Sequence, residues 1–265
     1  MGVSHNLWEV LAASKEVETL SDGSFDVTIG PLTKLWRSSR RRKEPPTSEY
    51  LEKAMAASGG KYLALHPITH SVSLSQPQMR LDLGGIAKGY ATDEGLRVLA
   101  QHGITRALVR ASGDISAGDP PPDSPSWKVG IAPLNSDEPP TLFLGLVRQA
   151  VSTSGDSQQF LVVNGVRYSH IVDPKTGWGV TGRSSVTVVG PLGLFTDSLA
   201  SAVSIQGGKK GLKMLQQKEG YAALVVADED PKGQGKTMHW YVTPGFEKLL
   251  IEGRLPDHAR QIFPQ

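Results

Sequence analysis

Hydrophobic residues recur along the chain with two periods, and the longer one predicts five helices. In residues 6–19, Leu7, Leu11 and Val17 recur at the spacing of an amphipathic helix. Four later segments show a similar spacing, and each ends at or just before a glycine, which is a common helix stop. We therefore expect helices over residues 6–19, 49–58, 84–103, 194–207 and 208–220.

Shorter apolar runs with a period of two predict strands between these helices. The runs lie at residues 62–66, 71–75, 79–83, 107–111, 127–132, 142–147, 150–154, 158–163, 168–172, 184–190 and 221–228. Many of them follow one another across short turns, which antiparallel strands can do and parallel strands cannot. The pattern predicts an α+β fold in one domain, residues 1–265, with helices packed on a mixed, largely antiparallel sheet.

Composition and charge narrow the functional classes. The 28 Lys and Arg nearly balance the 26 Asp and Glu, so no global charge favours nucleic acid or a membrane surface. No cysteine is present, which excludes disulfides, thiolate metal sites and a cysteine nucleophile. No run of about 18 apolar residues predicts insertion into a membrane. The N-terminal residues carry no secretion signal or lipid-attachment cysteine, so the sequence as written predicts a cytoplasmic protein. The basic run at residues 37–43 is expected to be a solvated loop.

Two glycines between a predicted strand and a predicted helix form the first candidate site. In MRLDLGGIAKGY, residues 79–90, Asp82 and Lys88 flank Gly84 and Gly85. Glycines permit close backbone approach, and a helix start offers free N–H groups to an anion such as phosphate. The alternative is a tight structural corner with a solvated lysine.

A carboxylate and a hydroxyl form the second candidate site. Asp197 and Ser201 are four residues apart in a predicted helix, so both face the same side. Hard oxygen ligands of this kind suit Mg²⁺. The alternative is a structural role, with Asp197 favouring the helix dipole and Ser201 serving as a small packing residue.

A histidine at the end of a predicted strand is the third candidate. His170 precedes the turn formed by Asp173 and Pro174, and it could act as a base or as a donor to phosphate. The alternative is a partly buried histidine bonded to the backbone. Two hydroxyl-rich or glycine-containing turns, SGDI at 112–115 and STSGD at 152–156, are weaker signals.

The order of these segments resembles that of one known family. The segments are SDGSFDVTIGPLTKLW (21–36), LDLGGIAKGYATD (81–93), ASGDI (111–115), STSGD (152–156), RYSHIVDPKTG (167–177) and TDSLASA (196–202). They resemble the ApbE family of FAD:protein FMN transferases, which implies a T-fold-like α+β architecture. The resemblance also implies cleavage of FAD with Mg²⁺, or with Mn²⁺ in its place. FMN is then transferred to a threonine hydroxyl of an acceptor flavoprotein, such as a subunit of a membrane redox complex, and AMP leaves.

The resemblance also implies roles for individual residues. Ser24, Phe25, Asp26, Asp82, Lys88 and Val172 are expected to contact the flavin nucleotide. Asp197, Ser201 and the carbonyl of Gly85 are the expected metal ligands, and the backbone at Ala200 could add an oxygen. His170 is the expected proton acceptor.

The chain differs from the family pattern in three ways. It begins after the point where the family's N-terminal strand and Met-Gly-Thr turn are expected. Ser201 replaces the usual threonine, and Ser112 stands where glycine is commoner, in a turn that requires a positive φ. Two alternatives to the transferase therefore stay open: an FAD pyrophosphatase that uses water as acceptor, and a non-catalytic flavin-binding or scaffold protein. Because the family commonly works outside the cytoplasm, the resemblance and the missing signal give opposite expectations for localisation.

Overall fold

The structure is a computed structural model that describes residues 1–134, 138–155, 159–230, 232 and 238–262. Its helices are α1 (His5–Leu20), α2 (Gly30–Arg42), α3 (Ser48–Ala56), α4 (Ala87–Gln101), α5 (Gly193–Gln206) and α6 (Gly208–Leu215), with three 3₁₀ turns at η1 (Gly60–Tyr62), η2 (Pro67–Thr69) and η3 (Glu247–Leu249). The five helices predicted from apolar spacing are all present, and α2 is additional. None of the helices described here is long and apolar enough to cross a membrane.

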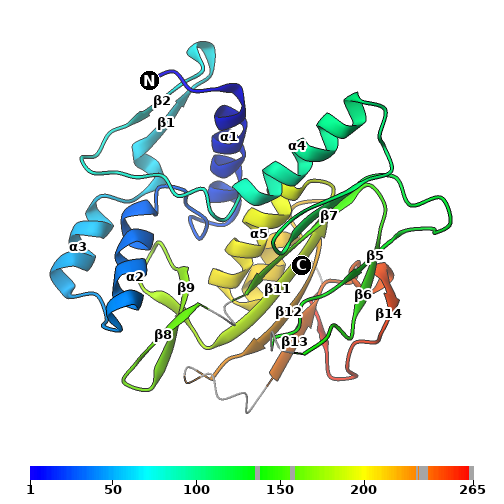
Figure 1. The fold of residues 1–265 in the computed structure, drawn as a ribbon. Coiled ribbons are helices and arrows are strands. Elements are labelled where there is room, and N and C mark those ends of the chain that lie inside the picture. The colour runs from blue at the N-terminus through cyan, green and yellow to red at the C-terminus, as the bar shows by residue number, and fades with distance from the viewer. Residues whose placement is uncertain (135–137, 156–158, 231, 233–237, 263–265) are drawn as a thin grey trace.

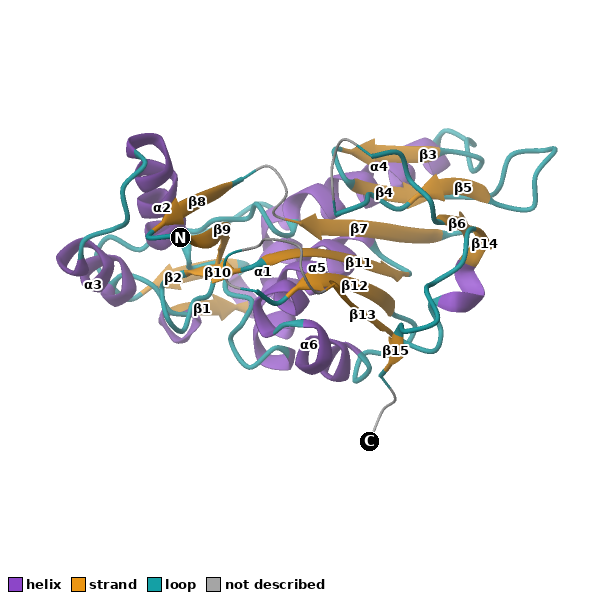
Figure 2. Cartoon of the chain, turned by 90° about the horizontal axis from the view of Figure 1, so that it is seen from below, coloured by secondary structure: helices purple, strands orange, loops and turns teal. Residues whose placement is uncertain are grey.

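The largest sheet contains seven of the fifteen strands that the structure describes. The strands are β1 (Leu63–His66), β2 (Ser71–Leu74), β3 (Leu108–Ala111), β4 (Asp114–Ala117), β5 (Trp127–Gly130), β6 (Phe143–Leu146), β7 (Gln149–Gly155), β8 (Phe160–Val163), β9 (Val166–Val172), β10 (Gly179–Thr181), β11 (Arg183–Gly190), β12 (Ala222–Asp228), β13 (Met238–Val242), β14 (Leu250–Glu252) and β15 (Arg260–Gln261). The large sheet has the order β15-β13-β12-β11-β7-β4-β3, and only the β13–β15 pair is parallel. The predicted α+β class with a largely antiparallel sheet is confirmed (Figures 1 and 2).

The buried helix α5 lies across the large sheet and forms the centre of the fold (Figure 1). It packs on β7 and β11, while α1, α4 and α6 pack on α5. The main apolar core lies between these layers and includes Leu11, Val186, Leu199 and Leu212, none of which exposes any surface. The buried hydroxyls of Thr196, Ser198 and Ser204 donate to carbonyl oxygens of the preceding turn of α5, so the polar residues of this helix can be buried.

Strands β8, β9 and β10 form a small separate sheet beside the pocket described below. The chain leaves the large sheet after β7 and returns to it at β11, and the two strands are direct neighbours. The β8–β9 turn has positive φ at Asn164 and Gly165, the backbone conformation that an Asn-Gly hairpin favours. Helix α2 packs on this small sheet, where Trp36 is buried against Tyr168 and Trp178.

Two sequence predictions are wrong. Residues 37–42 of the basic run form the second half of α2 rather than a loop, and Lys43 follows its last turn. The helix forms because Leu32, Trp36 and Ser39 recur at helical spacing and are buried. Residues 79–83 form no strand, and their only ladder contact is an isolated bridge between Ile29 and Arg80. The alternating pattern of 79–83 arises because Leu81 and Leu83 both pack against the main core, in a segment held by single hydrogen bonds such as that from the Asp82 N–H to the Val27 carbonyl.

Candidate active site

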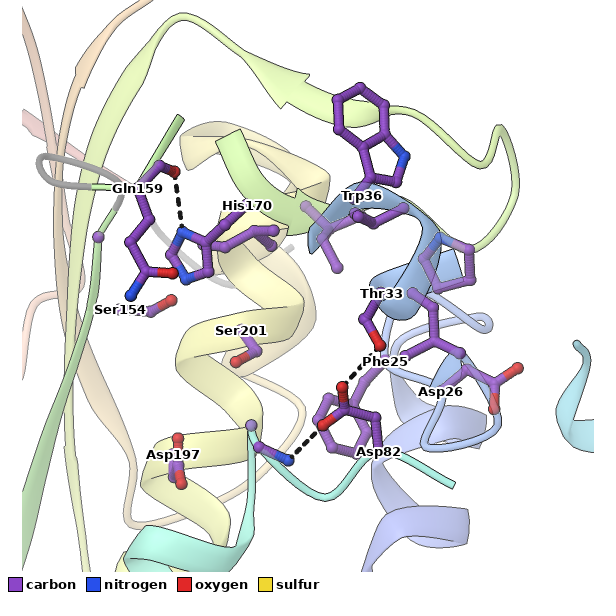
Figure 3. A pocket seen from close by; sticks show the side chains of 18 of the residues that line it. Phe25, Asp26, Thr33, Trp36, Asp82, Ser154, Gln159, His170, Asp197 and Ser201 are labelled. Carbon is purple, nitrogen blue, oxygen red and sulfur yellow. Dashed lines mark hydrogen bonds between the residues drawn. The ribbon is translucent and has the colours of Figure 1, made fainter. Parts of the chain in front are cut away.

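A pocket of about 390 Å³ lies between α2, α5 and the ends of β7 and β9. We call it the central pocket. Ten of the eleven residues that the family resemblance assigns to nucleotide, metal or proton contact line it: Ser24, Phe25, Asp26, Asp82, Gly85, Lys88, His170, Val172, Asp197 and Ser201. The eleventh, Ala200, is buried and is not among the lining residues. Figure 3 shows several of these side chains converging from different elements. The fold therefore brings together four segments that are far apart in the sequence.

Helix α5 supplies the two predicted side-chain metal ligands from one face. Asp197 and Ser201 are one turn apart, and both line the central pocket (Figure 3). A Cβ atom placed on Gly85 would lie 2.9 Å from the Ser201 hydroxyl oxygen, so only glycine lets this backbone lie so close. The three predicted metal ligands are thus neighbours in the structure.

The donor set of this corner fits a Mg²⁺ ion. It combines the carboxylate of Asp197, which is 5% exposed, with the hydroxyl of Ser201 and nearby backbone oxygens. The Ser201 hydroxyl makes no hydrogen bond to any residue within the described ranges, so it is available to a ligand. Mg²⁺ prefers such hard oxygens and completes its shell with water and phosphate. The described residues contain no cluster of three or more His, Cys, Asp or Glu side chains that could hold a metal by themselves.

Two buried carboxylates share one ammonium group beside this corner. Lys88 donates to Asp114, and its Nζ lies 3.4 Å from Asp197 Oδ1. Burial and the charge of Asp114 raise the pKa of Asp197 to about 6, although Lys88 acts in the opposite direction. Burial would lower the pKa of Lys88, but the two carboxylates outweigh it and raise that pKa. The corner therefore holds more negative charge than a single lysine neutralises well.

The carboxylate of Asp82 is fixed at the rim of the glycine corner. Its Oδ1 accepts from the Gly84 N–H at 2.9 Å, and its Oδ2 accepts from Thr33 at 2.6 Å (Figure 3). The same Oδ2 accepts from Arg37 at 2.8 Å. Asp82 thus links the corner to α2. Its side chain orders the residues at which the predicted nucleotide site lies.

The loop before α2 offers the central pocket the ring of Phe25 and its backbone, whereas the carboxylate of Asp26 is not free. Both carboxylate oxygens of Asp26 are used inside the chain, by the backbone and hydroxyl of Thr28 and by the Gly60 N–H. Asp26 therefore anchors the loop to residues 59–60. Phe25 is buried, and its ring would lie 3.4 Å from a Cβ on Gly85. Ser24 accepts a hydrogen bond from Gln206 of α5.

His170 lies at the opposite end of the central pocket from the glycine corner. Its Nδ1 is 3.2 Å from the main-chain carbonyl oxygen of Gln159 (Figure 3). A carbonyl oxygen only accepts hydrogen bonds, so Nδ1 carries the proton in the neutral ring. The lone pair of the neutral ring is then on Nε2, which suits a proton acceptor.

Several pocket residues were not predicted from the sequence. Thr33, Trp36, Arg37 and Arg40 line one wall from a single face of α2. Their spacing of 0, 3, 4 and 7 is the helical signal that could have identified them. Arg40 donates to the neutral Gln159 side chain at 2.9 Å and forms no ion pair with any carboxylate among the described residues. Gln159 also lines the pocket without having been predicted. Asp114 does not line the pocket but binds Lys88 beside it, and it has no sequence signal beyond its turn.

Comparisons with known proteins identify the family. The sequence profile of the ApbE family matches residues 1–225. The chain is 27% identical over 255 residues to the FAD:protein FMN transferase of Escherichia coli K12, covering 94% of this chain and 71% of that protein.

Solved structures give the same result for the fold. The ApbE flavin transferase of Vibrio cholerae is similar with a TM-score of 0.80 at 28% identity, over 94% of this chain and 78% of that chain. The ApbE protein of Thermotoga maritima is similar with a TM-score of 0.82 at 28% identity, over 95% of this chain and 80% of that chain. The chain belongs to the ApbE family.

Proposed function

We propose that this protein transfers FMN from FAD to a hydroxyl group of another protein and releases AMP. One observation carries the proposal: the central pocket joins the oxygen-rich corner at Gly85, Asp197 and Ser201 with a histidine at its other end. The relatives named as FAD:protein FMN transferases support the same reaction. A threonine as the accepting residue, and a membrane redox complex as its carrier, are the finer parts of the proposal.

The glycine corner is suited to the pyrophosphate of FAD. Gly85 allows its backbone to lie against the Ser201 hydroxyl and the Phe25 ring, which a Cβ atom there would meet. Lys88 places a positive charge beside the same corner. We propose that these groups bind and orient the two phosphates, while Phe25 and the apolar wall at Val172 contact the flavin.

Asp197, Ser201 and the Gly85 carbonyl would hold Mg²⁺ in this proposal. When bound, the ion would neutralise negative charge that develops on the pyrophosphate. The protein's own part is to hold the oxygen donors in place before the substrate arrives. Helix α5, which is buried along most of its length, provides that rigidity.

His170 would take the proton of the acceptor hydroxyl. The hydroxyl oxygen forms a bond to the phosphorus of the FMN half, the phosphorus–oxygen bond to AMP breaks, and the proton moves to Nε2 of His170. The bond between Nδ1 and the Gln159 carbonyl orients the ring for this step. AMP leaves with the electrons of the broken bond.

The proposal is tested by incubating the protein with FAD and MgCl₂, with and without candidate acceptor proteins. AMP release measures cleavage of FAD, and flavin fluorescence that survives denaturing electrophoresis measures covalent transfer. Transfer that depends on an acceptor threonine supports the transferase. AMP release to water alone, with every acceptor tested, would replace it with the pyrophosphatase, and no AMP release would favour the non-catalytic alternative.

A further inference from the structure

Helices α4 and α5 meet at their N-terminal ends, and each end is capped by a carboxylate of the other helix (Figure 1). Asp93 of α4 accepts from the Gly193 N–H at 2.8 Å and from the Leu194 N–H at 2.9 Å. Asp197 of α5 accepts from the Gly89 N–H at 3.2 Å. The residues that precede the two helices, Ile86 and Leu192, have no capping side chain, so these are the side-chain caps that the two ends receive.

The carboxylate of Asp93 is held in its capping position by further hydrogen bonds and by no ion pair among the described residues. Its Oδ1 also accepts from the Ser116 hydroxyl at 2.7 Å, and Ser116 is held in turn by Thr92 at 2.8 Å. No Lys, Arg or His of the described chain forms an ion pair with Asp93, so its charge is matched mainly by the positive end of α5. Burial nevertheless raises the pKa of Asp93, so the free N–H groups of α5 hold a carboxylate that is partly removed from water.

The two helix ends lie so close together that no side chain fits between them. A Cβ on Gly89 would lie 1.9 Å from the Gly193 carbonyl oxygen, and one on Gly193 would lie 2.6 Å from the Gly89 carbonyl oxygen. Asp93 fixes residues 193 and 194 at this contact. Asp197 and Ser201 follow on α5 at one and two turns, and both line the central pocket.

We infer that Asp93, which does not itself line the pocket, is a positioning residue that sets α5 so that Asp197 and Ser201 face Gly85. The inference rests on the proposed function for the identity of the metal. The property that it concerns is the conformational order at the start of α5. Side chains that orient metal ligands typically change metal affinity about 10–100-fold when they are removed.

The test compares Asp93→Asn and Asp93→Ala with Thr47→Ala. Thr47 caps α3, away from the pocket, through a bond from the Tyr50 N–H. Two quantities are measured in each protein: the hydrogen-exchange rates of the amides at 193–197, and the factor by which MgCl₂ tightens FAD binding. Melting temperatures show whether each variant folds and how far it is destabilised.

We expect Asp93→Asn to accelerate exchange at the start of α5 and to reduce the Mg²⁺ factor about tenfold. Asp93→Ala should do more, and FAD affinity without Mg²⁺ should stay within about twofold of the wild type. Thr47→Ala should change neither quantity, even where its melting temperature falls equally. Unchanged exchange at 193–197 in both Asp93 variants overturns the inference. If Mg²⁺ does not tighten FAD binding to the wild type, the metal in the proposed function fails, and the exchange rates still decide the role of Asp93.

Discussion

The ammonium nitrogen of Lys88 lies 3.4 Å from one carboxylate oxygen of Asp197 and also donates to Asp114. The two carboxylates are almost fully buried, while the lysine side chain is 45% exposed. The lysine is therefore the accessible member of a buried charge cluster. Its contribution to folding and the contribution of a bound cation should be partly interchangeable.

Lys88→Met is expected to lower the free energy of unfolding by about 1–3 kcal/mol in metal-free buffer. Removing one partner of a buried pair costs more than this, but the exposure of Lys88 reduces the effect. MgCl₂ should raise the melting temperature of the variant more than that of the wild type, because the variant has more unbalanced charge. Scanning fluorimetry with and without MgCl₂ measures both. Lys128→Met, which breaks the exposed pair with Glu252, is the control; equal Mg²⁺ shifts in all three proteins contradict the prediction.

Asp197→Asn should abolish Mg²⁺-dependent AMP release, because the carboxylate is the charged ligand of the set. Ser201→Ala should only raise the Mg²⁺ concentration needed for half-maximal rate. Ser201→Thr should lower that concentration, since a β-branched side chain has fewer rotamers to lose. The measurement is the initial rate of AMP release against MgCl₂ concentration. Full activity of Asp197→Asn at limiting Mg²⁺ would refute the assignment of this residue as a metal ligand.

His170→Asn is expected to lower turnover about 10²–10⁴-fold and to leave FAD affinity within a few-fold. The asparagine can still donate to the Gln159 carbonyl, so the strand end should keep its structure. Turnover is measured as transfer to an acceptor, and affinity as quenching of flavin fluorescence. A large fall in melting temperature with little loss of rate per folded molecule would instead indicate a structural histidine.

Ser112→Gly should raise the free energy of unfolding by about 0.5–1 kcal/mol. Ser112 has a φ of 59° in the turn between β3 and β4. This backbone region costs an L-residue about 1–2 kcal/mol, which glycine avoids. Part of that gain is offset, because glycine has a larger conformational entropy in the unfolded chain. Ser112→Ala, which keeps the strained backbone, should give no such gain. Urea denaturation of the three proteins distinguishes relief of strain from loss of the hydroxyl.

FAD should bind much more tightly than riboflavin, which has no phosphate. The reason is that, in the proposed site, the glycine corner and Lys88 bind the phosphates and contribute little to binding of the flavin ring. Calorimetric titration of both ligands in MgCl₂ gives the ratio. Equal affinities would remove the glycine corner from the binding site.

Local sequence patterns predicted those parts of the site in which residues of suitable chemistry lie at the right spacing on a single helix or turn. Asp197 and Ser201 lie on one helix face because four residues make about one turn, and the glycines before Lys88 mark a close approach. The positive φ of Ser112, expected from a turn that usually holds glycine, is confirmed. Five of the six described helices were predicted in the same local way, because apolar residues recur at helical spacing along each of them.

Contacts between distant segments could not be predicted in this way. The basic residues of α2 suggested solvent, yet the face that holds Trp36 is buried by β9 and the neighbouring turn, about 140 positions further along. The pairing of Lys88 with Asp114 likewise depends on how β4 lies against α4. Beyond residue 228 the sequence yielded no predicted elements, and β13, β14 and β15 were found only in the structure.

The chain segment that forms the small sheet and carries His170 leaves the large sheet after β7 and returns to it at β11, which is the direct neighbour of β7. Gly155, the last residue of β7, pairs with Ser185 near the start of β11, so the two ends of this excursion are adjacent in space. Segments with adjacent ends can be exchanged without disturbing the scaffold that holds them. Residues 159–182 thus lie between two paired strands, and evolution or protein engineering could replace them as one segment. His170, the proposed proton acceptor, and its wall of the pocket would change together, while the proposed phosphate site at Gly85, Lys88 and α5 would be kept.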